Sequence, residues 1–298
     1  MPNSAKNSWV AGTLTALLGL FFVDLAAAQE SSSRVIAVGG SVTEIVYALE
    51  QEDRLIAADS TSTYPPAATD LPDIGYIRTL SAEPILALAP DLILAEPAAG
   101  PPVALTQIRD AGVALHVIPD EPTPQGVLTK IEAVADALGV PESGTALAAR
   151  VKRDFADLER KLAELRERPR VLFLLSMSGG APLAAGRETA ADAIIRLAGG
   201  RNAVTGYADY KPLTPEAAVD LAPDVILINA GSGHSPDGGR EAFLARPEIA
   251  ATPAGRNKRV IAMDGLLLLG FGPRTPEAAR RLAADLHPEL QLADASDE

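Results

Sequence analysis

The 298-residue sequence contains no cysteine. It can therefore form no disulfide bond, offers no thiol nucleophile, and has no thiol to carry a lipid at a processed N-terminus. Aromatic residues are also scarce, at 4%, so each tyrosine is worth locating. Basic residues are outnumbered by acidic ones, 26 to 39, and the resulting net charge of −13 argues against binding to a nucleic-acid backbone. A hydrophobic content of 47% is enough for a sizeable core.

The N-terminus has the pattern of an export signal. Lys6 precedes an apolar run at residues 9–23, which is short for a membrane span of about 20 residues. Ala26 and Ala28 then form an A-x-A arrangement. The pattern predicts a signal peptide over residues 1–28, cut near Ala28, and a protein free in the periplasm without a lipid anchor. An uncleaved N-terminal anchor is the alternative.

Buried strands alternate with helical segments along the rest of the chain. This order favours an α/β fold of two Rossmann-like lobes, with mostly parallel sheets and a ligand cleft between the lobes. A charged run without proline predicts one long helix joining them. Ser41 and Glu44 form a predicted capping box at the start of the first helix. The expected strands are residues 35–38, 54–59, 91–95, 114–119, 170–176, 224–230 and 259–264, and the expected domains are 29–142, 143–168 (the linking helix) and 169–298.

A short pattern occurs once in each half, 133 positions apart. In it, Glu83 corresponds to Glu216, and Leu-Ala-Pro-Asp at 88–91 corresponds to the same residues at 221–224. Both glutamates fall in the first turn of a predicted helix, where the helix dipole favours a carboxylate. That explains either glutamate alone. The matched pair also fits docking to a symmetric basic partner, since paired charges fix register and speed encounter.

The repeated block, with the order lobe, long helix, lobe, resembles the periplasmic substrate-binding proteins of ABC importers. The similar subclass carries haem, cobalamin or ferric siderophores, and the resemblance covers essentially the whole mature chain. It implies that Glu83 and Glu216 engage arginines on the two subunits of a membrane permease. It also implies a monomeric carrier that is not an enzyme and that belongs to an uptake system for the ligand and its iron.

The segment "GYIRTLSAEPILAL", which begins at Gly75, is similar to the hemin-binding members of that family. The resemblance implies that Tyr76 is an axial ligand of ferric haem b. The chemistry agrees, because a phenolate is a hard donor for ferric iron and has precedent as a haem ligand. A phenol in water ionises only at about pH 10, so a nearby cation favours the phenolate. Arg78 shares a face with Tyr76 if that segment is extended. Tyr76 as a packing aromatic is the alternative.

Other residues are candidates for the remaining haem contacts. Arg78, Lys211 and Arg274 are candidate partners of the propionates, because cations pair with carboxylates. Solvated surface charge is the alternative for Lys211 and Arg274. Tyr207 and Tyr210 precede the second copy of the pattern, where some related carriers place a histidine ligand that this sequence lacks. They are candidates to approach the iron or to stack on the porphyrin.

The three histidines do not cluster, which argues against a zinc or manganese carrier. His116 lies in a predicted strand, His287 is predicted to cap the last helix, and His234 lies in a predicted loop. Cobalamin or a ferric siderophore is the alternative ligand. An exported α/β enzyme is a more distant one, because the glycines after the first strand do not form G-x-G-x-x-G, and G-x-S-x-G is absent.

Overall fold

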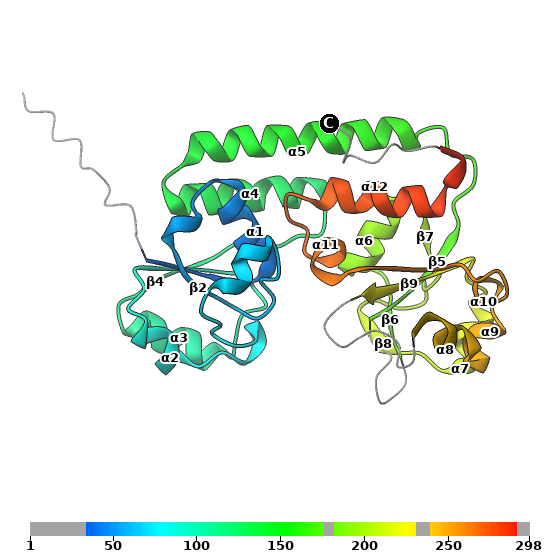
Figure 1. Cartoon of the computed structure of the whole chain (residues 1–298), viewed down its shortest axis with the longest axis horizontal. Coiled ribbons are helices and arrows are strands. Elements are labelled where there is room, and N and C mark those ends of the chain that lie inside the picture. Colours follow the sequence, from blue (N-terminus) through cyan, green and yellow to red (C-terminus); the bar gives the residue numbers. More distant parts are fainter. Residues whose placement is uncertain (1–33, 176–181, 231–238, 291–298) are drawn as a thin grey trace, which may run out of the picture. The chain divides into compact units, whose positions relative to one another are not determined.

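The computed structural model describes residues 34–175, 182–230 and 239–290 (Figure 1). The predicted signal peptide and His234 lie outside these ranges. Among the described helices, none combines the length and the apolar character needed to cross a membrane.

The first sheet is entirely parallel, in the order β2-β1-β3-β4. The two central strands, β1 and β3, are buried at every position, as expected for strands covered by helices on both faces. Four predicted strands are therefore confirmed, with ends shifted by a residue or two. The strands are β1 (Val35–Val38), β2 (Leu55–Ala58), β3 (Leu92–Ala95) and β4 (Ala114–Val117), and the helices between them are α1 (Gly40–Ala48), α2 (Ala82–Ala87) and α3 (Pro102–Asp110).

The second sheet has six strands, and its parallel part is confirmed in the same way. Strands β5 (Arg170–Leu174), β9 (Val225–Ala230) and β10 (Val260–Asp264) are parallel, and the short β7 (Arg201–Asn202) joins β5. An antiparallel extension from β6 (Leu183–Ala185) to β8 (Tyr210–Pro212) was not predicted. Its helices are α6 (Ala190–Leu197), α7 (Pro215–Asp220), α8 (Gly239–Ala245), α9 (Pro247–Ala250), α10 (Pro253–Arg256), α11 (Gly265–Leu269) and α12 (Thr275–Leu286).

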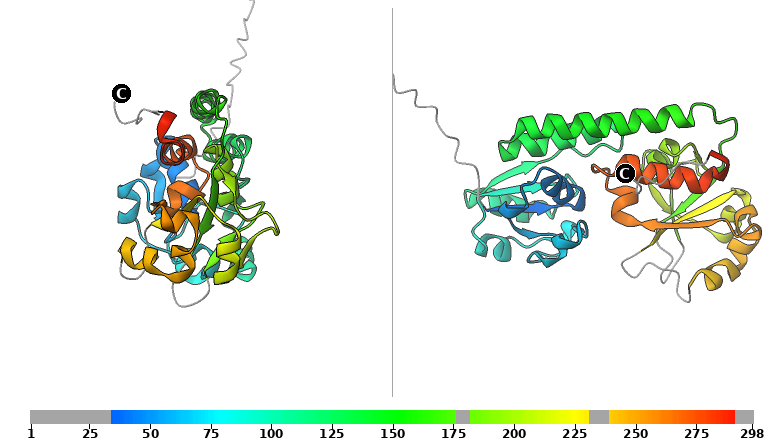
Figure 2. Two further views of the ribbon diagram at one scale, coloured as in Figure 1. Left: turned by 90° about the vertical axis from the view of Figure 1, so that its right-hand side faces the viewer. Right: turned by 45° about the horizontal axis from the view of Figure 1, so that its top comes forward.

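The long linking helix is α5 (Pro141–Leu162), which lies along α4 (Pro124–Leu138) and contacts α12 (Figures 1 and 2). The prediction that it extends to residue 168 was wrong. The chain leaves the helix after Leu162 because it must reach the start of β5 at Arg170, and helix propensity carries no information about that destination. Gly144 of α5 faces Ala135 of α4, and a side chain at Gly144 would overlap the Ala135 methyl group.

One hydrophobic cluster runs through both lobes. It joins the α1 side of the first sheet to α4 and α5, and continues to α6, α12 and one face of the second sheet. The opposite face of each sheet has its own smaller cluster. Residues Ser31–Glu298 accordingly form one compact unit. The domain boundaries at 142 and 168 stay a prediction.

The repeated Leu-Ala-Pro-Asp has a structural role in the first lobe. Arg34 directly precedes β1. Its side chain donates from Nη2 to the Leu88 carbonyl (2.6 Å) and from Nε to the Ala89 carbonyl (2.8 Å). The Asp91 carboxylate accepts from the Arg34 backbone N–H (3.1 Å). Ala89 has a φ of +46°, so the backbone turns sharply there. The arginine thus satisfies carbonyls at the end of α2 that have no partner inside the helix.

The second lobe repeats this anchor. Arg170 enters β5 and donates from Nη2 to the Leu221 carbonyl (2.6 Å), and the Asp224 carboxylate accepts from the Arg170 backbone N–H (2.8 Å). Ala222 has a φ of +42°. Each lobe therefore ties the end of its short repeated helix to the start of its first strand, which explains why the pattern extends beyond the glutamates.

Candidate ligand-binding and docking site

The two matched glutamates occupy equivalent places. Glu83 lies in the first turn of α2 and Glu216 in the first turn of α7, and both are exposed. Within the described ranges, neither carboxylate forms an ion pair. The Thr214 hydroxyl caps α7 by accepting from the Ala217 N–H (3.3 Å), whereas Ser81, at the same place before α2, makes no such bond. Both carboxylates are available to an external partner.

Tyr76 lies where the loops after β2 and β3 meet. The Ser60 N–H donates to the Gly75 carbonyl (3.0 Å), and Leu80 donates to Gly100 in the loop after β3 (2.8 Å). These loops leave the carboxyl ends of parallel strands, where open α/β sheets bind their ligands. The Tyr76 side chain is 47% exposed. No group in the described part of the chain hydrogen-bonds to its hydroxyl, which leaves the oxygen free to bind a metal centre.

Arg78 was expected to share a face with Tyr76 only if the segment is extended, and this condition is not met. Ile77–Thr79 forms a 3-10 helix, η3, instead of continuing the extended backbone of Tyr76. A 3-10 helix turns about 120° per residue, so positions 76 and 78 do not share a face. Arg78 is exposed on the same loop, and in the described ranges its side chain has no ion-pair partner.

Tyr207 and Lys211 form a pair on the second lobe. The Lys211 ammonium lies 5.1 Å from the centroid of the Tyr207 ring, which is within cation–π range. Among the described residues, the Tyr207 hydroxyl makes one long contact of 3.5 Å, with the Ala184 carbonyl. Partial burial raises the pKa of Tyr207 above its ordinary value, which disfavours a phenolate there and leaves its ring and the ammonium as the useful groups.

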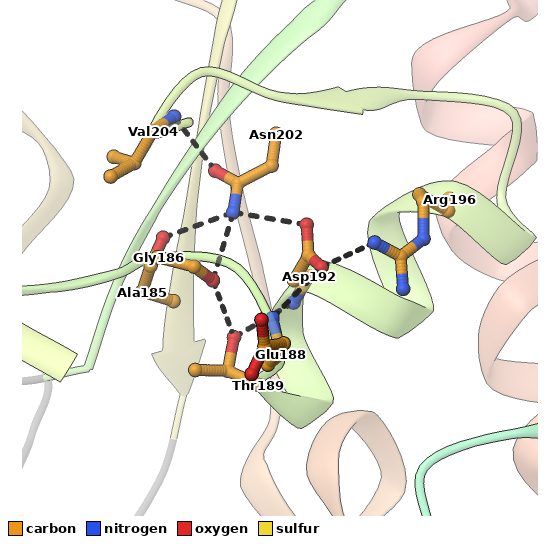
Figure 3. A network of polar contacts seen from close by, with 8 residues as sticks. All are labelled: Ala185, Gly186, Glu188, Thr189, Asp192, Arg196, Asn202 and Val204. Carbon is orange, nitrogen blue, oxygen red and sulfur yellow. Dashed lines mark hydrogen bonds and ion pairs between the residues drawn. The ribbon is translucent and has the colours of Figure 1, made fainter. Parts of the chain in front are cut away.

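A buried polar network stabilises the segment at Ala185 and Gly186 (Figure 3). This segment directly follows Ala184, whose carbonyl the Tyr207 hydroxyl contacts. Asn202 donates from Nδ2 to the Ala185 and Gly186 carbonyls (3.1 and 3.2 Å) and to the Asp192 carboxylate (3.2 Å). Asp192 also pairs with Arg196. The backbone around Tyr207 is hydrogen-bonded to the same segment. The Arg187 N–H donates to the Tyr207 carbonyl, and the Gly186 N–H donates to the Asp209 carbonyl (both 2.9 Å). The short strands β6 and β8 therefore rest on buried polar contacts as well as on apolar packing.

Tyr210 is partly buried and packs against the hydrophobic core of the second lobe. Its ring meets Phe173 edge-on, with centroids 6.4 Å apart. Burial raises the pKa of Tyr210, even though the Ala191 backbone and the Thr189 side chain hydrogen-bond to its hydroxyl. These contacts indicate a packing role and do not support the predicted contact with a ligand.

Arg274 is engaged by the first lobe. Its Nη2 donates to the Glu44 carboxylate (2.8 Å), and its backbone N–H donates to the other Glu44 oxygen (3.1 Å). Its guanidinium stacks on the Tyr64 ring at 3.3 Å from the centroid. The predicted propionate contact would have to compete with these partners.

The predicted capping box at the start of α1 was wrong, because Ser41 and Glu44 bind residues far away in the sequence instead of the helix backbone. The helix begins at Gly40, with Gly39 as N-cap and no side-chain cap. Ser41 instead donates to the Glu96 carboxylate (2.6 Å), and Glu44 binds Arg274. Long-range partners have taken both side chains, and no pattern in the local sequence contains them.

Lys130 was missed by the sequence analysis. It is 0% exposed, and its ammonium donates to the Ser41 hydroxyl (2.9 Å), the Gly270 carbonyl (3.1 Å) and the Asp120 carboxylate (2.7 Å). All three of its hydrogens are thereby used. A signal was present, because Lys130 falls inside the apolar stripe of α4, which a lysine rarely joins without a partner.

Glu96 belongs to the same network, because it accepts from the Ser41 hydroxyl that also binds Lys130. Burial raises the pKa of Glu96, and the nearby Lys130 ammonium and the Ser41 hydrogen bond offset only part of that rise. The network therefore makes ionisation of Glu96 less favourable than ionisation of a carboxyl group in water.

The described histidines take ordinary places. His116 is exposed on the edge strand β4, and His287 is the C-cap residue of α12, as predicted. Groups of three or more metal-ligating side chains do not occur among the described residues.

A known protein family matches most of the chain. The model of the periplasmic binding protein family matches residues 35–266, which include both sheets. The chain belongs to this family. Such binding proteins are extracytoplasmic components of transport systems rather than enzymes.

Solved structures of binding proteins closely resemble this one. The periplasmic heme-binding protein BhuT, in complex with two hemes, is 46% identical, with a TM-score of 0.81 over 86% of this chain and 98% of its own. The periplasmic heme-binding protein RhuT from Roseiflexus sp. RS-1, in apo form, is 42% identical, with a TM-score of 0.83 over 87% and 100%. The vitamin B12-binding protein of Vibrio cholerae (strain ATCC 39541) is 29% identical over 86% of this chain and 89% of its own.

Proposed function

We propose that this binding protein takes up haem in the periplasm and delivers it to the permease of an ABC importer. The exposed phenol of Tyr76 carries the proposal, because it stands at the carboxyl edge of the first sheet within the segment that resembles haem carriers. The similarity to BhuT and RhuT, at 46% and 42% identity, supports haem as the ligand. The carrier is a monomer, exported by a signal peptide at 1–28.

In this proposal Tyr76 ligates the iron of ferric haem b from the first lobe. Lys211 meets a propionate from the second lobe, and the Tyr207 ring beneath it contacts the porphyrin. Arg78 is the first-lobe candidate for the other propionate. Tyr210 and Arg274 have protein partners instead, so the proposal leaves them out of the ligand contacts.

Substitution of Tyr76 by phenylalanine tests the ligand. Purified mature protein is titrated with hemin, and the Soret and charge-transfer bands are recorded. We expect the wild type to bind and Tyr76→Phe to lose the charge-transfer band of a tyrosinate complex, while Tyr210→Phe keeps it. An unchanged band in Tyr76→Phe places the iron ligand elsewhere. The end point of the titration also counts the haems, since BhuT holds two.

Cobalamin is the second candidate, because the Vibrio cholerae relative binds vitamin B12. The same protein is titrated with cyanocobalamin and with a ferric siderophore. Tight cobalamin binding without a hemin-induced Soret change would replace haem as the ligand and would remove the role of Tyr76.

Delivery is proposed to use Glu83 and Glu216 against basic residues of a permease dimer. ATP hydrolysis by the reconstituted importer is measured with Glu83→Gln, Glu216→Gln and the double variant. We expect each single change to weaken stimulation by the binding protein and the double change to abolish it. Glu142→Gln is the matched control, since Glu142 is an exposed first-turn glutamate of α5. Equal effects from all three positions would exclude a specific docking pair.

A further inference from the structure

Polar contacts between the lobes converge on one short segment of the second lobe, residues 270–274. From the first lobe, α1 supplies Glu44, α4 supplies Lys130, and the loop after β2 supplies Tyr64. The lobes are therefore joined through these contacts as well as through α5. The segment precedes α12, so its position also fixes where that helix begins.

The Glu44–Arg274 contact is largely shielded from water. The Glu44 side chain is 6% exposed and the Arg274 side chain 19%. Glu44 accepts from both the side chain and the backbone of Arg274, which fixes the main chain as well as the guanidinium. The Arg274 Nε is enclosed and has no partner among the described residues. To bind a ligand carboxylate, the guanidinium would have to leave a shielded partner, which costs more than moving a solvated arginine.

The Tyr64 contact connects this pair to the candidate iron ligand. The loop that carries Tyr64 starts at Asp59, whose carboxylate accepts from the Gly39 N–H at the start of α1 (2.7 Å). It ends at Gly75, which Ser60 holds through a backbone bond of 3.0 Å. Tyr76 is the next residue. Arg274 thus packs on the same closed loop that presents Tyr76.

We infer that Glu44 and Arg274 are positioning residues that fix the spacing of the two lobes and the placement of the Tyr76 loop. Arg274 keeps Glu44 as its partner when the ligand is bound. The effect on the ligand rests on the proposed function, whereas the effect on lobe spacing does not. Lys130 supports the same contact through its bond to the Gly270 carbonyl.

Lobe spacing is tested first in ligand-free protein. Because the chain has no cysteine, Gln107→Cys in α3 and Asp220→Cys in α7 provide two unique spin-label positions, both exposed. Distances between the two spin labels are then measured by pulsed electron–electron double resonance and compared among variants. We expect Glu44→Gln and Arg274→Met each to broaden the distribution, with no further change in the double variant. Arg281→Met, which breaks a pair with Glu277 inside α12, leaves it unchanged. An unaltered distribution in both variants overturns the inference.

Hemin release to excess apomyoglobin then separates positioning from direct binding. If the pair is a positioning contact, Glu44→Gln and Arg274→Met both accelerate release, each by about tenfold, or about 1.4 kcal/mol, and the double variant is no faster. If Arg274 instead binds a propionate, Arg274→Met accelerates release whereas Glu44→Gln, which frees the arginine, slows it or has no effect. That second pattern overturns the inference.

Two further measurements keep the outcomes distinct. Arg274→Lys retains the cation but loses the planar stack on Tyr64, so it should broaden the distances less than Arg274→Met does, and it serves if the latter fails to fold. Equal distances in Arg274→Lys and in the wild type, with an unfolded Arg274→Met, count against the contact. A wild type that binds no hemin refutes the proposed function, while the spin-label distances still decide the lobe contact.

Discussion

Replacement of Lys130 by methionine removes a buried ammonium and keeps most of the side-chain length. The wild-type ammonium has three partners, Ser41, Gly270 and Asp120, at 2.7–3.1 Å, and is 0% exposed. Methionine fills the space but donates to none of them. The Gly270 carbonyl loses its side-chain donor, and the Asp120 carboxylate loses its ion-pair partner.

The magnitude follows from what each partner does next. Breaking a buried ion pair by removing one member typically costs about 3–5 kcal/mol. The lower end applies here, because Asp120 is 36% exposed and water can solvate its carboxylate. A loss of about 3 kcal/mol corresponds to a fall in Tm of roughly 6–12 °C for a protein of this size.

Urea unfolding followed by far-UV circular dichroism measures the effect. Lys152→Met is the matched control, since Lys152 lies exposed on α5 and its loss should change stability by less than about 0.5 kcal/mol. Asp120→Asn, added to Lys130→Met, removes the stranded carboxylate and should restore part of the loss. A Lys130→Met protein as stable as the Lys152→Met control refutes the account of the buried network.

Three further predictions follow from the same contacts. Because burial raises the pKa of Glu96, its contribution to stability is full below the unfolded value of about 4.3 and is lost as pH rises through the folded value. Glu96→Gln should therefore gain stability relative to the wild type as the pH rises above about 4.3, and parallel pH profiles in urea unfolding would contradict this. Gly144→Val should cost about 1–3 kcal/mol by overpacking against Ala135, whereas Ser143→Val on the exposed side should not, as compared by thermal unfolding. Arg170→Ala should destabilise by about 1–3 kcal/mol through the freed Leu221 carbonyl, which is partly buried. Arg34→Ala should cost less, about 0.5–1.5 kcal/mol, because its bonds are exposed and water can reach the freed carbonyls. The two losses should add, because the anchors share no partner; a double variant no worse than either single one would contradict separate anchors.

The strands of both parallel sheets could be predicted because a strand covered on two faces is a continuous apolar run, such as Val35–Val38. The strands β6, β7 and β8 were missed because they span only two or three residues, and β7 and β8 also carry polar side chains such as Lys211. The end of α5 was also missed, since residues 163–168 remain good helix formers by composition.

The candidate site divides in the same way. Glu83, Glu216 and Tyr76 were proposed as site residues from a repeat and a resemblance, both of which are local in sequence. Apart from Asp120, which lies 10 positions from Lys130, the partners of Ser41, Glu44 and Lys130 lie 55 to 230 positions away. Nothing in the local pattern distinguishes such a residue from a helix cap or a solvated charge until the fold brings the two segments together.

The hydrophobic cluster shared by α4, α5, α6 and α12 determines how the protein should respond to cleavage of its backbone. A nick in the connection between α5 and β5 would leave two fragments, each with an uncovered apolar face matched by the other. Each fragment would keep only the smaller cluster on the other face of its sheet, so the two should be poorly soluble when produced apart and should reassemble when produced together.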